Sequence, residues 1–140
     1  MSGYALDANI ISFLLRGNRQ LQERIYREAN NGRGVIVLPV AYYEVKRGLI
    51  NYKAHGKLVA FERLCKRLGV DEIDIETLDC AANIYASLKT QGRLIEDSDI
   101  LIAASCLAHG KTLVTDNTRH FERIDGLDIV NWTGQHEYHL

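Results

Sequence analysis

The chain has 140 residues, enough for one domain with a substantial core, and its 46% hydrophobic and 25% charged content is ordinary for a globular protein. Three cysteines without a CxxC pair argue against a disulfide framework. The sequence shows neither a signal-peptide pattern nor an apolar run long enough to span a bilayer. These features argue against a secreted disulfide scaffold and a membrane protein, and we expect a cytoplasmic protein.

The net charge of −1 conceals an asymmetry between the two halves. Residues 1–70 carry 12 Lys and Arg against 5 Asp and Glu, whereas residues 71–140 carry 5 against 13. Such a charge distribution is typical of a protein that acts on a polyanion, which the basic half of the chain binds and the acidic half processes.

Strands and helices alternate from the N-terminus. Tyr4–Leu6 predicts a first strand that runs into Asp7. Asn9 is a candidate cap for a short helix that Gly17 ends, and a helix over 19–29 follows. The short helix holds more apolar residues than one core face needs, which is typical of an interaction surface. Those residues are Ile10, Ile11, Phe13, Leu14 and Leu15.

The middle of the chain continues the alternation. Val35–Leu38 is uninterrupted apolar, as expected for a strand covered on both faces. Pro39 fits the first turn of a helix that runs to about Tyr52. Two further helices are predicted at about 57–68 and 75–90, with a short strand near 70–73 between them.

The C-terminal third contains the most apolar helix, Ser98–His109, which we expect in the middle of the fold. Gly110 ends it, Thr112–Thr115 predicts a strand that leads to Asp116, and Leu127–Val130 predicts an edge strand. The order of elements predicts an α/β fold, with a parallel sheet of about four to five strands flanked by helices. We expect one domain over residues 1–133 and a tail over 134–140.

Acidic side chains recur where these elements meet. Ligands of parallel α/β sheets bind at the carboxyl ends of the strands, so acids from distant segments can share one cleft there. A cluster of carboxylates is stable when a cation holds it, and oxygen ligands select Mg²⁺ or Mn²⁺. The candidate ligands are Asp7, Glu44, Asp99 and Asp116, with Asn9, Asn117 and Asp97 as neighbours that orient them.

Each acid also has a simpler interpretation. An Asp-x-Asn sequence after a strand commonly caps a helix, and acids in a first helical turn are favoured by the helix dipole. Two alternatives therefore stay open: a non-catalytic RNA- or partner-binding module, and a phosphatase with Asp7 as nucleophile. The phosphatase requires an acid two residues later, where this chain has Asn9, a poor proton donor.

The segment from Lys46 to Arg67 holds seven basic residues and one acid, Glu62. RNA binding and a solvated helix face explain such a run equally well. The candidate RNA contacts are Lys46, Arg47, Lys53 and Lys57. The histidines predict no zinc site, because His55, His109 and His120 are scattered and the His136–His139 pair belongs to the tail.

Taken together, four segments resemble the PIN-domain family, and within it the VapC-type toxin ribonucleases of toxin–antitoxin pairs. The similarity extends over most of the chain, as far as Asn131-Trp132. The four segments are Leu6–Ser12, Glu44–Gly48, Asp99–Ala104 and Leu113–Phe121.

The resemblance implies a PIN-like three-layer sandwich and a Mg²⁺- or Mn²⁺-dependent endoribonuclease. It places the four acids of the family at Asp7, Glu44, Asp99 and Asp116, whereas Ala8 departs from the usual Thr or Ser. It further implies an RNA substrate, with structured RNA such as tRNA favoured, a homodimer, and inhibition by a VapB-like antitoxin.

Overall fold

The computed structural model describes residues 3–134. Within them, one parallel sheet has the strand order β2–β1–β3–β4, which confirms the predicted α/β fold. The strands are β1 (Tyr4–Leu6), β2 (Val35–Val37), β3 (Thr112–Val114) and β4 (Ile129–Val130). The predicted tail, with the His136–His139 pair, lies outside the described residues except for Gly134.

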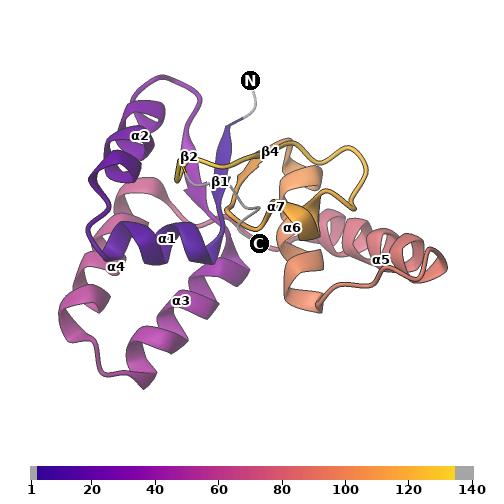
Figure 1. Cartoon of the computed structure of the whole chain (residues 1–140), viewed down its shortest axis with the longest axis horizontal. Coiled ribbons are helices and arrows are strands. Elements are labelled where there is room, and N and C mark those ends of the chain that lie inside the picture. The colour runs from indigo at the N-terminus through magenta and orange to yellow at the C-terminus, as the bar shows by residue number, and fades with distance from the viewer. Residues whose placement is uncertain (1–2, 135–140) are drawn as a thin grey trace.

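Helices cover both sides of this sheet, as a three-layer sandwich requires (Figure 1). One group contains α1 (Ala8–Leu15), α2 (Arg19–Ala29), α3 (Pro39–Asn51) and α4 (His55–Leu68). The other contains α5 (Ile75–Thr90), α6 (Asp97–His109) and the short α7 (Thr118–Phe121). Among residues 3–134, no helix combines the length and the apolar character that a membrane crossing needs.

The strand order places a topological switch point between β1 and β3. After β1 the chain moves to one neighbouring position, β2, and then crosses to the other side of β1 to form β3. In α/β proteins, ligands bind at the carboxyl ends of the strands at such a switch point. Asp7 directly follows β1, and Asp116 lies two residues after β3. The fold thus brings two of the predicted acids to the place where α/β proteins bind ligands.

Three local predictions differ from the structure. The N-cap of α1 is Asp7 and not Asn9, because Asp7 has the extended backbone of a cap and accepts from the Ala8 N–H. The segment near 70–73 forms only an isolated bridge between Val37 and Val70. Helix α7 was not predicted, since four residues are too few to show a hydrophobic period.

The apolar residues of α1 contribute mainly to the core. Ile10 and Ile11 are fully buried, and Phe13, Leu14 and Leu15 are partly buried against the same core. The prediction that α1 exposes an apolar surface is therefore wrong, because α2, α3 and α4 all pack against this helix. Helix α6 is buried as predicted, with Ile102, Ala103 and Cys106 almost inaccessible.

Candidate active site

Asp7 and Asp116 lie at the ends of neighbouring strands because β1 and β3 pair in parallel, with Leu6 opposite Val114. This register places Asp7 beside Thr115, the residue before Asp116. The Asp7 N–H donates to the Val114 carbonyl at 3.0 Å, which fixes the register at the strand ends. From the exposed start of α1, Asn9 Nδ2 donates to Asp116 Oδ1 at 3.2 Å. The predicted role of Asn9 as a neighbour that orients a carboxylate is consistent with this contact.

Asp7 is the most deeply placed of the four acids, with 6% of its surface exposed. Its Oδ1 accepts from the Ala8 N–H at 2.7 Å, and its Oδ2 accepts from the Thr115 hydroxyl at 2.8 Å. The pKa of Asp7 is raised to about 6, first by burial and to a smaller extent by the negative charges of Asp99 and Glu44, and these effects outweigh the two hydrogen bonds. The site therefore holds a carboxyl group with too little compensating positive charge.

Glu44 projects from the middle of α3 toward the same region. Burial is the largest cause that raises the pKa of Glu44. The positive charge of Arg47 lowers this pKa, and the negative charges of Asp99 and Glu96 raise it. Asp99 acts on both Asp7 and Glu44, so these three acids share one electrostatic environment. Asp99 belongs to the first turn of α6 and is half-buried. We call Asp7, Glu44, Asp99 and Asp116 the carboxylate cluster.

Two residues near the cluster were missed in the sequence. His120, from α7, has its Nδ1 3.2 Å from Asp99 Oδ2 and 3.1 Å from Asn117 Nδ2. Nδ1 donates to the Asp99 carboxylate when it carries a proton and accepts from the Asn117 amide when it does not, so the two bonds alternate with the tautomer. The buried hydroxyl of Thr115 donates to Asp7 and accepts from the Asn117 N–H at 3.0 Å. The only signal for either residue was its position within four residues of Asp116.

The remaining predicted residues lie around this centre. Asp97 is exposed in the first turn of α6, and it is Glu96 rather than Asp97 that acts on Glu44. Lys46 donates to the Tyr42 hydroxyl at 2.9 Å and pairs with Glu62 at 3.6 Å. Arg47 stacks on Tyr43, with its guanidinium carbon 5.1 Å from the ring centre. Lys53 and Lys57 are exposed at the end of α3 and the start of α4.

The donor atoms of the cluster fit a hard divalent cation. Its donors are carboxylate oxygens, and the pKa values of Asp7 and Glu44 are raised, first by burial and then by the charges of neighbouring acids. Across residues 3–134, no three acidic, histidine or cysteine side chains are already arranged to hold a metal ion. The donor set is thus appropriate, although its side chains are not preassembled at ligand spacing.

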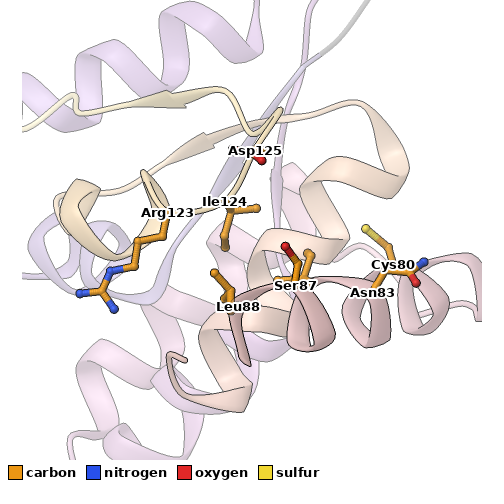
Figure 2. A pocket seen from close by; sticks show the side chains of 8 residues that line it. Cys80, Asn83, Ser87, Leu88, Arg123, Ile124 and Asp125 are labelled. Carbon is orange, nitrogen blue, oxygen red and sulfur yellow. The ribbon is translucent and has the colours of Figure 1, made fainter. Parts of the chain in front are cut away.

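A separate pocket of about 430 Å³ does not belong to this site. It lies between α5 and the turn after α7, where Ile124 and Leu88 approach each other and Arg123 extends away from Asn83 and Cys80 (Figure 2). No member of the carboxylate cluster lines it. The acids, and not this pocket, therefore define the candidate site.

Comparison with known proteins agrees with this geometry. The model of the PIN domain matches residues 4–127. The chain belongs to the PIN-domain family. This PIN domain is similar to a Haemophilus influenzae protein named ribonuclease VapC2, with 31% identity over 94% of this chain and 99% of that protein. It is also similar to the tRNA(fMet)-specific endonuclease VapC of Shigella flexneri, with 29% identity over 95% and 100%.

A solved structure supports the same relationship. The PIN domain superposes on DNA-bound VapBC from Salmonella typhimurium with a TM-score of 0.84 and 26% identity, over 94% of this chain and 99% of that one. The resemblance to VapC-type toxins seen in the sequence is thereby confirmed. In this PIN domain Asp7 and Asp116 lie at the switch point of the sheet, and Asp99 and Glu44 act electrostatically on Asp7.

Proposed function

We propose that this PIN domain is a divalent-metal-dependent endoribonuclease and the toxin of a toxin–antitoxin pair. The observation that carries the proposal is that Asp7 lies at the switch point between β1 and β3, where the charges of Asp99 and Glu44 act on it and Asn9 donates to Asp116. Helix capping accounts for Asp7 alone and gives no reason for Glu44 and Asp99 to act on the same carboxyl group. The non-catalytic alternative therefore explains less of the structure.

The substrate class follows from the relatives. The Haemophilus influenzae relative is named a ribonuclease, and the name of the Shigella flexneri relative specifies a tRNA. We propose RNA as the substrate and tRNA as the class to test first. The phosphatase alternative loses support, because Asn9 donates to Asp116 and does not supply an acidic proton.

The residues of the cluster have distinct tasks in this proposal. Asp7, Glu44, Asp99 and Asp116 would hold Mg²⁺ or Mn²⁺. When bound, such an ion neutralises charge on the phosphoryl oxygens and lowers the pKa of a water molecule. The Ala8 N–H and the Thr115 hydroxyl fix both oxygens of Asp7, and Asn9 fixes one oxygen of Asp116. These bonds orient the carboxylates before RNA arrives.

The proposed partners are an antitoxin and a second copy of this chain. The Salmonella typhimurium structure is of VapBC, bound to DNA, and we propose a VapB-like antitoxin for this PIN domain by similarity. We also propose a homodimer. Light scattering of the isolated chain at micromolar concentration should give the mass of a dimer, and a monomer would contradict that part.

One assay tests the central proposal. Labelled tRNA and a single-stranded RNA are incubated with the purified chain in Mg²⁺, in Mn²⁺ and in EDTA, beside Asp99→Asn. We expect cleavage that requires the metal and is lost in the variant. Equal cleavage in EDTA, or by Asp99→Asn, would rule the mechanism out.

A further inference from the structure

A hollow of about 330 Å³ is lined by residues of α1, α3 and α4 and of the loop between α3 and α4. These three helices lie next to one another in the fold (Figure 1). Glu44 lines it and thus belongs both to the hollow and to the cluster. Other lining residues are Ser12, Arg16, Leu49, Tyr52 and Lys57. We propose that this hollow binds the nucleotide next to the bond that is cut, with its base stacked on Tyr52. The inference rests on the proposed ribonuclease function.

The lining has the two parts that a nucleotide requires. Leu15, Val45 and Leu49 give it an apolar floor, and the basic side chains of Arg16 and Lys57 are exposed at its edge. Tyr52, the C-cap of α3, has 82% of its surface exposed, more than any other large hydrophobic residue among those described. Bases stack on exposed aromatic rings while basic groups contact the backbone phosphates. A nucleotide therefore matches both parts of the lining.

Gly48 provides a separate argument for a ligand. It lies inside α3, where glycine is less favourable than alanine, yet a Cβ at this position would meet no atom within 4 Å. Packing within the chain therefore does not require glycine there. Because Gly48 also lines the hollow, the absence of its side chain keeps the hollow open on the face that a base would occupy.

A second hollow, of about 510 Å³, lies along α3 on the other side of Glu44 and is less suited to RNA. It also contains an exposed tyrosine, Tyr43, but the Arg47 guanidinium already covers that ring. Glu96 adds a second acid to its lining. The hollow with Tyr52 has two basic residues against the single acid Glu44, so its charge is complementary to a phosphate backbone.

The test measures RNA binding without cleavage. Fluorescence anisotropy of labelled 12-nucleotide homopolymers of A, C, G and U is recorded with the full chain in EDTA. Tyr52→Ala should weaken binding about tenfold, whereas Tyr52→Phe retains the ring and should stay within about twofold. Gly48→Leu should fill the hollow and weaken binding to a similar degree. Tyr85→Ala, a matched exposed tyrosine on α5, should leave binding unchanged.

Salt dependence separates stacking from charge. Tyr52→Ala should leave the slope of log affinity against log salt unchanged, while Arg16→Gln with Lys57→Gln should flatten it by up to about 1.4. RNA binding that survives both Tyr52→Ala and Gly48→Leu would overturn the inference, as would failure of the wild-type chain to bind all four homopolymers. In the first case a protein partner would be the occupant. Metal-dependent cleavage by the wild-type chain can persist in either case, so the proposed function is judged separately.

Discussion

Two acidic regions of this PIN domain shift the pKa of a carboxyl group in opposite directions. In the carboxylate cluster, burial and the neighbouring acids raise the pKa of Asp7 to about 6. At the far end of α6, His109 lies between two acids, with Nδ1 2.8 Å from Asp71 Oδ2 and Nε2 2.9 Å from Asp74 Oδ2. We call these three residues the histidine clamp. There the pKa of Asp74 is held well below its usual range.

The difference lies in how each region compensates its charge. In the clamp, the hydrogen bonds from the Thr77 hydroxyl and backbone N–H lower the pKa of Asp74 the most, and the hydrogen bond from His109 lowers it less. The two acids in turn raise the pKa of His109, because both ring nitrogens donate to carboxylates only in the imidazolium form. The clamp ties the C-terminus of α6 to the N-cap of α5 and stabilises the fold. In the cluster, burial outweighs the hydrogen bonds to Asp7 and the charge of Arg47 near Glu44, so both pKa values stay raised, as is common at functional sites.

The largest expected difference between the two regions is in catalysis. Asp99→Asn should lower metal-dependent RNA cleavage by about 100-fold or more, because it removes a charge that holds the proposed ion. Asp71→Asn makes the same chemical change in the clamp and should leave the rate constant of cleavage unchanged. Single-turnover cleavage at saturating RNA measures both variants. Equal losses would mean that the distinction between cluster and clamp is wrong.

The next effect concerns stability without metal. The folded-state pKa of Asp7 is raised from 3.8 to about 6, so this group contributes stability below about pH 3.8 and loses it as the pH rises through 6. Asp7→Asn removes the buried charge and keeps an N-cap. Its free energy of unfolding in EDTA should exceed that of the wild type by about 1–2 kcal/mol at pH 8 and match it at pH 4. Urea unfolding at the two pH values checks this, and a less stable variant at pH 8 would contradict it.

Substitution in the clamp should destabilise the fold, whereas Asp7→Asn stabilises it. The folded-state pKa of His109 is raised, so its contribution is complete below about pH 6.5 and is lost as the pH rises through the folded-state value. The pKa of Asp74 is lowered, so its contribution is complete above about pH 3.8 and lost in stronger acid. His109→Gln should therefore lower Tm by several degrees at pH 5.5 and by less at pH 9. His55→Gln, at an exposed position, is the matched control, and a Tm difference independent of pH would argue against the clamp.

The sequence predicted those helices and strands that the residues of the segment itself determine. The uninterrupted apolar run at Val35–Leu38 and the apolar residues of Ser98–His109 fix a strand and a buried helix through their own composition. The strand–acid pattern at Asp7 and Asp116 predicted a shared cleft, because parallel strands end at the same edge. The order of the elements was thus accessible without coordinates.

The residues missed depend on distances that the sequence does not contain. His120 reaches Asp99 across 21 positions through a four-residue helix with no periodic signal. The partners of His109 lie 38 and 35 positions away, so a scattered histidine became the centre of the clamp. Whether Asp7 or Asn9 caps α1 depends on the backbone angles at Asp7, and both residue types are good caps.

The smallest expected effect on the rate of RNA cleavage comes from substitutions in the basic surface of α3 and α4, which must bring RNA to the carboxylate cluster. Lys46 is already engaged by Tyr42 and Glu62, and the more exposed cations are Lys53, Lys57 and Lys66. Replacing these three by Gln should weaken RNA binding uniformly across sequences, because phosphate contacts carry little sequence information.

The triple variant should also flatten the slope of log affinity against log salt by up to about 2, through lost counterion release from single-stranded RNA. Cleavage at saturating RNA should change little, since the cluster is untouched. A charge-matched control replaces Arg19, Arg27 and Lys89 on α2 and α5 by Gln and should leave the slope near the wild-type value. Equal slopes for the two triple variants would show that overall charge, and not the surface of α3 and α4, draws RNA to the acids.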